Sequence, residues 1–258
     1  MVGMSLFDTH AHLDFPQFSQ DREEVLASLR AHAVAVINVG ADLASSEASL
    51  NLARAYPFVF PSCGVHPHDA KTFSPEAERR LEDLLRSGAV AVGECGLDFY
   101  RDLSPREVQV RAFRTQLRLA RKLDLPVILH ERAAWDVFVA VLREEGPLRG
   151  VVHAFSGDER RAQEVLALGL HLGIGGPLTY PKNERLRQAV AKLPLHRILV
   201  ETDSPYLPPE PARGKRNDPR NVALVLERLA SILSRPVGEL AEVTWENACR
   251  LFGVTPRF

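Results

Sequence analysis

The sequence predicts an α/β protein, folded as a single (β/α)₈ barrel with a metal site at the C-terminal rim of its strands. Three observations lead to this prediction. Short β-branched runs alternate with amphipathic segments along the chain, and the runs number eight. Eight strand–helix units are the number that closes a parallel barrel. Histidine and carboxylate side chains follow several of the runs, at the end of a barrel where active sites lie.

The predicted strands are nearly continuous hydrophobic runs, which is typical of parallel strands buried on both faces. They are Leu6–His10, Val34–Val39, Val59–Cys63, Val90–Glu94, Val127–His130, Val151–His153, Leu172–Ile174 and Ile198–Glu201. An open doubly wound sheet is the alternative arrangement. No Gly-x-Gly-x-x-Gly pattern follows the first strand, so the closed barrel is favoured.

The segments between the strands have the spacing of amphipathic helices. The expected helices are Asp21–His32, Ala44–Ala55, Pro75–Ser87, Pro105–Leu123, Ala133–Glu145, Glu159–Leu168, Glu184–Leu193, Arg220–Ser234 and Val237–Phe252. Two of them begin with serine and then proline, at Ser74 and Ser104, and proline is favoured at the first helical position. The stretch Pro205–Pro219, rich in proline, glycine and charge, is expected to form a long functional loop.

The composition fits one domain spanning residues 1–258. The chain is 45% hydrophobic and 25% charged, and no stretch reads as an interdomain linker. The formal net charge of −1 provides no overall positive field that would steer nucleic acid. Binding of a polyanion therefore has to depend on local positive charge.

The cysteines and the N-terminus favour a soluble, cytoplasmic protein without a membrane segment. Cys63, Cys95 and Cys249 are odd in number and far apart, which predicts neither a disulfide framework nor a thiolate zinc site. The N-terminus lacks the basic and apolar regions of a signal peptide. The longest uncharged apolar stretch, roughly residues 33–41, is about half of a membrane span.

Six potential metal ligands lie at the C-terminal ends of five of the predicted strands. They are His10 and His12 at the end of the first strand, Glu94 at the end of the fourth, His130 of the fifth, His153 of the sixth and Asp203 of the eighth. Four imidazoles and two carboxylates exceed what one tetrahedral ion takes. Two divalent ions bridged by a carboxylate would use all six. The mixed donor set suits Zn²⁺ and Mn²⁺, and also Mg²⁺ where carboxylate and phosphate dominate.

Three segments that carry these ligands resemble the signature motifs of the TatD-type metal-dependent deoxyribonucleases. They are Asp8-Thr9-His10-Ala11-His12-Leu13-Asp14, Gly93-Glu94-Cys95-Gly96-Leu97-Asp98 and Glu201-Thr202-Asp203-Ser204-Pro205-Tyr206-Leu207. Residues 64–68, 153–157, 216–219 and 247–252 are also similar, so the resemblance covers essentially the whole chain. The chain departs from the family at Asp218, where a glutamate is common.

The resemblance implies a TIM-like barrel of the amidohydrolase superfamily and an enzyme that acts on ester bonds. The expected activity is that of a 3′–5′ exodeoxyribonuclease on single-stranded DNA, using a metal-activated water and no obligatory protein partner. Hydrolysis of another ester or amide, such as an aminoacyl ester on tRNA, is the nearest alternative. A non-enzymatic metal-binding interaction protein is an alternative of a different class, and the presence of all six ligands argues against it.

Resemblance and chemistry together assign roles to the six ligands. The first ion is expected on His10, His12 and Asp203, the second on His130 and His153, with Glu94 as the bridge. Asp203 is also expected to orient or deprotonate the attacking water. Asp203 and Glu94 are therefore the expected catalytic residues.

Other residues are expected around this site. Asp8 and Glu201 are expected to support the ligands without reaching an ion, because a carboxylate in the barrel needs a donor or cation beside it. His66 is expected to contact substrate phosphate, as the resemblance favours. The loop 213–217 adds three cations and an amide beside the last strand, and its Arg216 and Asn217 are expected to bind substrate.

Three more residues at the rim are candidates for contact with substrate. Tyr100 and Tyr206 can stack on bases or pack against the rim. Arg132, just after His130, is a candidate for phosphate on weaker grounds.

Overall fold

The computed structural model describes residues 4–258, within which eight strands form one parallel sheet. The strands are β1 (Leu6–Ala11), β2 (Val34–Val39), β3 (Val59–Cys63), β4 (Ala91–Asp98), β5 (Val127–Arg132), β6 (Gly150–Val152), β7 (His171–Ile174) and β8 (Ile198–Val200). Each pairs with the next in sequence order. At the remaining junction Ala11 forms a parallel bridge with Ser204, and the backbone N–H of Asp203 donates to the carbonyl of His10 over 2.8 Å. The predicted barrel is confirmed.

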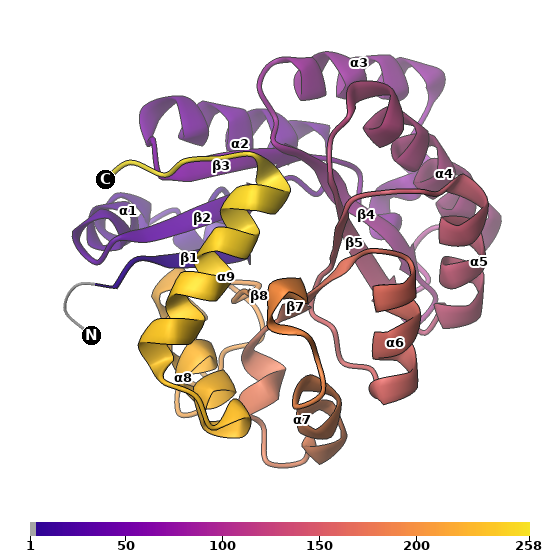
Figure 1. Cartoon of the computed structure of the whole chain (residues 1–258). Coiled ribbons are helices and arrows are strands. Elements are labelled where there is room, and N and C mark those ends of the chain that lie inside the picture. The colour runs from indigo at the N-terminus through magenta and orange to yellow at the C-terminus, as the bar shows by residue number, and fades with distance from the viewer. Residues whose placement is uncertain (1–3) are drawn as a thin grey trace.

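The helices alternate with the strands and lie around the outside of the barrel (Figure 1). They are α1 (Arg22–Ala31), α2 (Leu43–Ala55), α3 (Pro75–Arg86), α4 (Arg106–Leu123), α5 (Trp135–Glu145), α6 (Glu159–Ala167), α7 (Glu184–Val190), α8 (Val222–Leu233) and α9 (Val237–Phe252). Short 3-10 helices not expected from the sequence are η1 (Pro16–Phe18), η2 (Pro67–Thr72), η3 (Gly176–Thr179), η4 (Leu195–Arg197) and η5 (Pro219–Asn221). Within residues 4–258 we find no helix with the length and apolar character needed to cross a membrane.

Local capping explains where several helices begin. The Ser74 hydroxyl accepts the backbone N–H of Ala77 over 3.2 Å, with Pro75 at the first position of α3. At α2 the Asp42 carboxylate accepts the N–H of Ser45 over 2.7 Å, and the Ser45 hydroxyl accepts the N–H of Asp42. This capping box satisfies donors that the first helical turn leaves without partners.

Side chains of the strands divide into two apolar groups, as alternation in a strand requires. Outward residues such as Val36 and Leu129 pack beneath the helices, whereas Phe7, Ile37 and Ile128 point into the barrel. The inward group continues into Ala248, Leu251 and Phe252 of α9.

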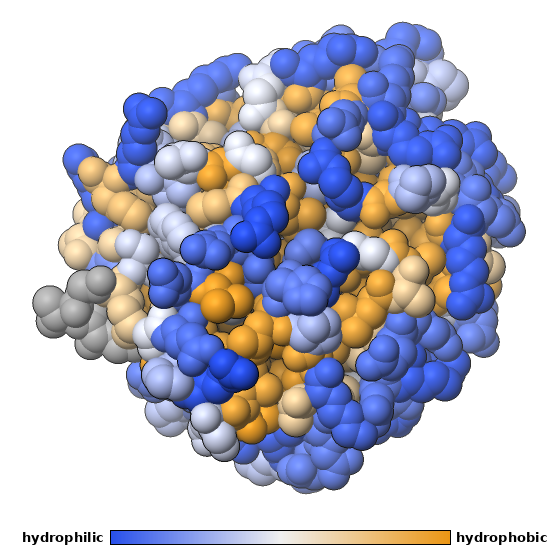
Figure 2. Space-filling model, viewed as in Figure 1, coloured by the Kyte–Doolittle hydropathy of each residue, from blue (hydrophilic) through white to orange (hydrophobic). Residues whose placement is uncertain are grey.

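Helix α9 lies across β1 and β8 (Figure 1), and through these contacts it closes the N-terminal end of the barrel. Seen from this side, the outer helices are largely hydrophilic, and apolar residues gather toward the centre (Figure 2).

The fourth strand is longer than the sequence predicts. Instead of ending at Glu94 it continues to Asp98, because Cys95–Asp98 pair with Leu129–Arg132 of β5. This extension carries Asp98 to the C-terminal rim. By contrast, β6 and β8 each end one residue earlier than predicted, at Val152 and Val200.

Candidate metal centre

Irregular pairing in β1 and β4 changes which way their side chains point, so that predicted ligands face the inside of the barrel. The β1–β2 register shifts between Asp8 and Ala11, and the β4–β5 register shifts between Val92 and Cys95. As a result, Val92 and Cys95 both belong to the outer core although they are three residues apart. Strict alternation would place Glu94 on the same outward face as Val92, so the irregularity aims its carboxylate inward, as such features often do beside active sites.

Glu94 lies at the centre of a cluster that contains all six predicted ligands. Its Oε2 lies 3.4 Å from His10 Nε2 and 3.8 Å from His12 Nε2. Its Oε1 lies 2.8 Å from both His130 Nδ1 and His153 Nε2. The two carboxylate oxygens therefore face two different pairs of imidazoles. This is the geometry that a bridging carboxylate needs.

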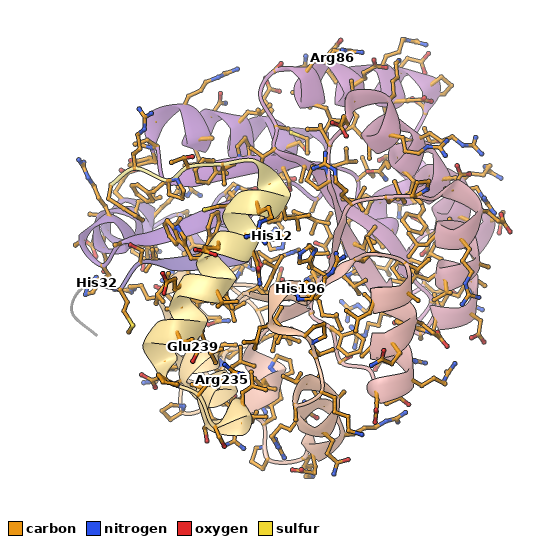
Figure 3. The ribbon with its side chains drawn as sticks, viewed as in Figure 1. His12, His32, Arg86, His196, Arg235 and Glu239 are labelled. Atoms are coloured by element: carbon orange, nitrogen blue, oxygen red, sulfur yellow. The ribbon has the colours of Figure 1, made fainter. Side chains whose placement is uncertain are left out.

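His10 and His12, the first pair of imidazoles, form with Asp203 a first group whose donor atoms have the spacing of a tetrahedral ion site. His10 Nε2 and His12 Nε2 lie 3.3 Å apart, and Asp203 Oδ1 lies 3.7 and 3.6 Å from them. Neighbouring ligands of a tetrahedral zinc ion, with bonds of about 2.1 Å, are about 3.4 Å apart. Figure 3 shows His12 inside the ring of strands, in contrast to His32 at the outer edge beside α1. The donor set and its spacing fit a divalent ion.

His130 and His153 form the second group with Glu94. Beside them lies the imidazole of His66, which the sequence predicts to contact substrate. His130 Nδ1 and His153 Nε2 lie 3.2 Å apart, and His66 Nε2 lies 3.6 Å from Glu94 Oε1. His66, Glu94 and His130 offer three donor atoms within 4.8 Å of one another. His66 Nδ1 accepts the backbone N–H of His68 over 3.1 Å, so its Nε2 carries the ring proton and is a donor suited to a carboxylate or a phosphate.

The ring nitrogens that point away from the cluster meet groups that orient them. His12 Nδ1 donates to the carbonyl of Val39 over 2.8 Å, which leaves Nε2 as an acceptor facing Asp203. His153 Nδ1 lies 3.5 Å from Glu201 Oε1, and His130 Nε2 lies 3.4 Å from Asp98 Oδ2. Metal-binding histidines usually have a carbonyl or carboxylate at this second nitrogen.

The two supporting carboxylates are placed differently from one another. Glu201 lies beside His153, and Gly173 leaves room for it: a Cβ there would lie 2.2 Å from Glu201 Oε2. Asp8 accepts the backbone N–H groups of His10 and Thr202 over 3.2 and 2.9 Å. Asp8 therefore supports the ligands by holding β1 to the end of β8, and not by contacting the imidazole rings.

Asp98 is a site residue that the sequence analysis missed. It is buried, its Oδ2 lies 2.7 Å from His68 Nε2, and its Oδ1 accepts the backbone N–H groups of Tyr100 and Arg101. The sequence predicts that the fourth strand ends at Glu94, so Asp98 was not expected at the rim, although it is the last residue of the motif Gly93–Asp98.

The electrostatics of the cluster favour ionised carboxylates. Burial alone raises the pKa of Glu94, but the charges of His153, His66 and His10 outweigh it and hold that pKa well below its usual range. Burial acts to raise the pKa of Asp203, but the hydrogen bond from His12 and the charges of His153 and His10 together outweigh it and lower that pKa.

The imidazoles respond to the same cluster in different directions. Burial lowers the pKa of His66 well below its usual range and also lowers that of His10. Burial also acts to lower the pKa of His153, but Glu94 and Glu201 raise it well above its usual value. Because an imidazole nitrogen binds a metal only when it carries no proton, ion binding at this cluster would depend on pH.

The cluster forms the floor of a cavity of about 650 Å³. Five carboxylates line it, from Asp69, Glu94, Asp98, Glu131 and Asp203. The lysines and arginines in this lining, within residues 4–258, are Arg101 and Arg132 alone. The lining is therefore acidic.

The loop at residues 213–217 does not supply the pocket with cations. Arg216 donates to both oxygens of Asp21, over 2.6 and 2.7 Å, and its guanidinium carbon lies 4.3 Å from the centre of the Phe18 ring. This pairing lowers the pKa of Asp21. Arg216 lines a separate cavity of about 420 Å³ with residues of η1 and its flanks.

The expected substrate contact by Asn217 is wrong. Its side chain is fully buried, and its amide N–H groups donate to the carbonyls of Thr202 and Tyr206 over 2.8 and 2.6 Å. Its oxygen accepts the N–H groups of Asp218 and Asn221. Asn217 thus ties the loop to the segment that carries Asp203, because all of its polar atoms have partners inside the protein.

Comparisons with known proteins identify the family and the relatives of this chain. A sequence profile of the family described as "TatD related DNase" matches residues 7–253. The chain is 38% identical to "Uncharacterized metal-dependent hydrolase YabD" of Bacillus subtilis, over 96% of this chain and 99% of that protein. It is 39% identical to "3'-5' ssDNA/RNA exonuclease TatD" of Cronobacter sakazakii, over 96% and 97% of the two chains.

A solved structure shares the fold closely. The crystal structure of YjjV, a TatD homologue from Escherichia coli K12, superposes with a TM-score of 0.91 at 35% identity, covering 97% of this chain and 98% of that one. With a barrel that closes on a buried cluster of histidines and carboxylates, and with a family match over almost its full length, the chain belongs to the TatD-related family of metal-dependent hydrolases.

Proposed function

We propose that this protein is a 3′–5′ exonuclease that hydrolyses phosphodiester bonds of single-stranded DNA with two divalent ions. The observation that carries the proposal is the position of Glu94, whose two oxygens face separate imidazole pairs on the floor of one pocket. Two ions held by a common carboxylate are suited to phosphoester hydrolysis. The polarity and the single-stranded substrate come from the name of the Cronobacter sakazakii relative.

The charge of the pocket supports a requirement for cations. Five carboxylates and two guanidiniums line it, so the pocket without ions repels a polyanion. When bound, two divalent ions would reverse that balance, activate water and neutralise charge on the reacting phosphate. We assign the first ion to His10, His12 and Asp203, and the second to His130 and His153.

Within this site the protein's own residues have separate tasks. Asp203 is proposed to orient the attacking water and to accept its proton, and its lowered pKa keeps it ionised for this role. His66 is proposed to contact the phosphate, because its Nε2 is a donor. Asp8 and Glu201 hold the ligand-bearing strands and the His153 ring in place.

Burial of the cluster favours the free end of a nucleic-acid strand as substrate over the side of a duplex. His10 is 0% and Glu94 3% exposed, so a reacting phosphate has to enter the pocket to reach them. An extended single strand can carry its terminal phosphodiester inside. A stacked duplex presents its phosphates only on its outer surface.

The test is single-turnover degradation of a single-stranded oligonucleotide labelled at its 5′ end. Protein stripped with a chelator is reconstituted separately with Mg²⁺, Mn²⁺ and Zn²⁺, with Asp203→Ala as the blank and a circular single strand as the control without ends. We expect stepwise loss of 3′ nucleotides from the linear strand only, abolished in Asp203→Ala. Cleavage of the circle would show an endonuclease. Absence of cleavage with ions bound would show that the substrate is a different ester.

A further inference from the structure

An exposed aromatic ring lies under the guanidinium of an arginine that lines the pocket. The guanidinium carbon of Arg132 lies 4.0 Å from the centre of the Tyr100 ring, a cation–π contact. Tyr100 is 65% exposed, more than any other exposed large hydrophobic residue in the part of the chain that the structure describes. Packing within the protein does not account for an aromatic ring so open to water.

Backbone hydrogen bonds hold this pair of side chains in place. The buried Asp98 accepts the N–H groups of Tyr100 and Arg101 over 3.0 and 2.8 Å. The N–H of Phe99 donates to the carbonyl of Arg132 over 2.9 Å, and Asp98 is paired with Arg132 in the β4–β5 register. Two adjacent strand ends therefore present Tyr100 and Arg132 as a preorganised surface, which reduces the entropy lost on binding.

The charges beside this surface are available to a ligand. Within residues 4–258 neither Arg101 nor Arg132 has a carboxylate within 4.0 Å, and both line the pocket. The neighbouring Arg106, in contrast, pairs with Asp102 at 3.2 Å. The cations that line the pocket are thus Arg101, just after β4, and Arg132, at the end of β5, and not those of the loop 213–217.

We propose that Tyr100 and Arg132 form a stacking platform for one unpaired nucleobase of the substrate, and that Arg101 binds an adjacent phosphate. This inference rests on the proposed function, since it takes the ligand to be a single strand of nucleic acid. Aromatic rings and guanidinium planes both stack on bases of any sequence. A base inside a duplex has both faces covered by its neighbours, so the platform selects single strands without reading their sequence.

The test measures binding and cleavage separately. Fluorescence anisotropy gives the Kd of wild-type protein for a labelled oligothymidylate and for the same strand with abasic residues at its three 3′-terminal positions. Cleavage of both strands is followed in parallel. The variants are Tyr100→Ala, Tyr100→Phe, Arg101→Ala and, as a matched control on the outer surface of α4, Arg111→Ala.

We expect wild-type protein to prefer the strand with bases by about tenfold or more, the effect of stacking one base. Tyr100→Ala should lose most of this preference, whereas Tyr100→Phe, which retains the ring, should keep it. Arg101→Ala should leave the preference unchanged and reduce the slope of log affinity against log salt concentration by about 0.7, the value for one phosphate contact on a single strand. Arg111→Ala should change neither quantity.

Each outcome separates this inference from the proposed function. If Tyr100→Ala keeps the wild-type preference, or if wild-type protein shows none, the platform is wrong even where cleavage proceeds. If the preference depends on Tyr100 but no strand is cleaved, the platform is right and the exonuclease activity is wrong. If wild-type protein binds neither strand, both are overturned.

Discussion

The two ends of the barrel are built from the same strands and differ in almost every other respect. At the N-terminal end, inward side chains such as Phe7, Ile37 and Ile128 pack against Leu251 and Phe252 of α9. At the C-terminal end, the same strands present imidazoles and carboxylates around Glu94. One end is buried and apolar, and the other is buried but polar.

The apolar end stabilises the fold, whereas the polar end holds the candidate metal ligands. Burial of each large apolar side chain contributes about 1.5–3 kcal/mol to stability. Buried polar atoms without partners cost stability. His10 Nδ1 makes no hydrogen bond within the described residues, and His130 Nε2 and His153 Nδ1 have only carboxylate oxygens at 3.4 and 3.5 Å. The polar end therefore depends on the apolar end for stability, and bound cations would offset part of its cost.

We expect the largest effect from a substitution at the polar end of the barrel. Glu94→Ala removes the carboxylate that faces both groups of imidazoles, so we expect turnover to fall by about three orders of magnitude or more. Ions bound per chain, measured by mass spectrometry, should fall below the wild-type number. Asp69→Ala, which removes a carboxylate from the same pocket but outside both groups, is the matched control. Wild-type turnover in the Glu94 variant would overturn the bridging role.

The next effect tests the apolar end. Leu251→Ala leaves a cavity between α9 and the barrel, so we expect the free energy of unfolding to fall by about 2–5 kcal/mol. The kcat of the folded protein should stay within about twofold, because the change lies at the opposite end from the cluster. Leu103, which is 50% exposed, provides the control: Leu103→Ala should change stability by no more than about 0.5 kcal/mol. Loss of turnover in Leu251→Ala at full metal content would show that the two ends are coupled.

The smallest expected effect concerns the edge of the polar end. Arg216 pairs with Asp21 outside the metal pocket, so Arg216→Ala should lower stability by about 0–1 kcal/mol. The KM for single-stranded DNA should remain within about twofold of wild type, and Asp21→Asn should behave in the same way. A tenfold rise in KM for Arg216→Ala alone would restore the substrate contact expected from the sequence.

The sequence by itself determined the barrel and the six members of the cluster. Hydrophobic runs and amphipathic segments are local signals, and their eightfold alternation allows few other arrangements. The C-terminal ends of parallel strands meet at one rim, so His10, Glu94, His130 and Asp203 were expected together before any distance was known.

The tertiary structure decided everything that depends on contacts between distant segments. The register shifts that aim Glu94 inward arise from pairing between β4 and β5. Asn217 is buried where its amide N–H groups donate to the carbonyls of Thr202 and Tyr206. His66, which follows β3, lies beside Glu94 of β4. Arg101 lines the pocket because Asp98 holds its turn. A sequence pattern reports which residues share a face of one element, whereas side-chain partners across elements follow only from how the strands are placed against one another.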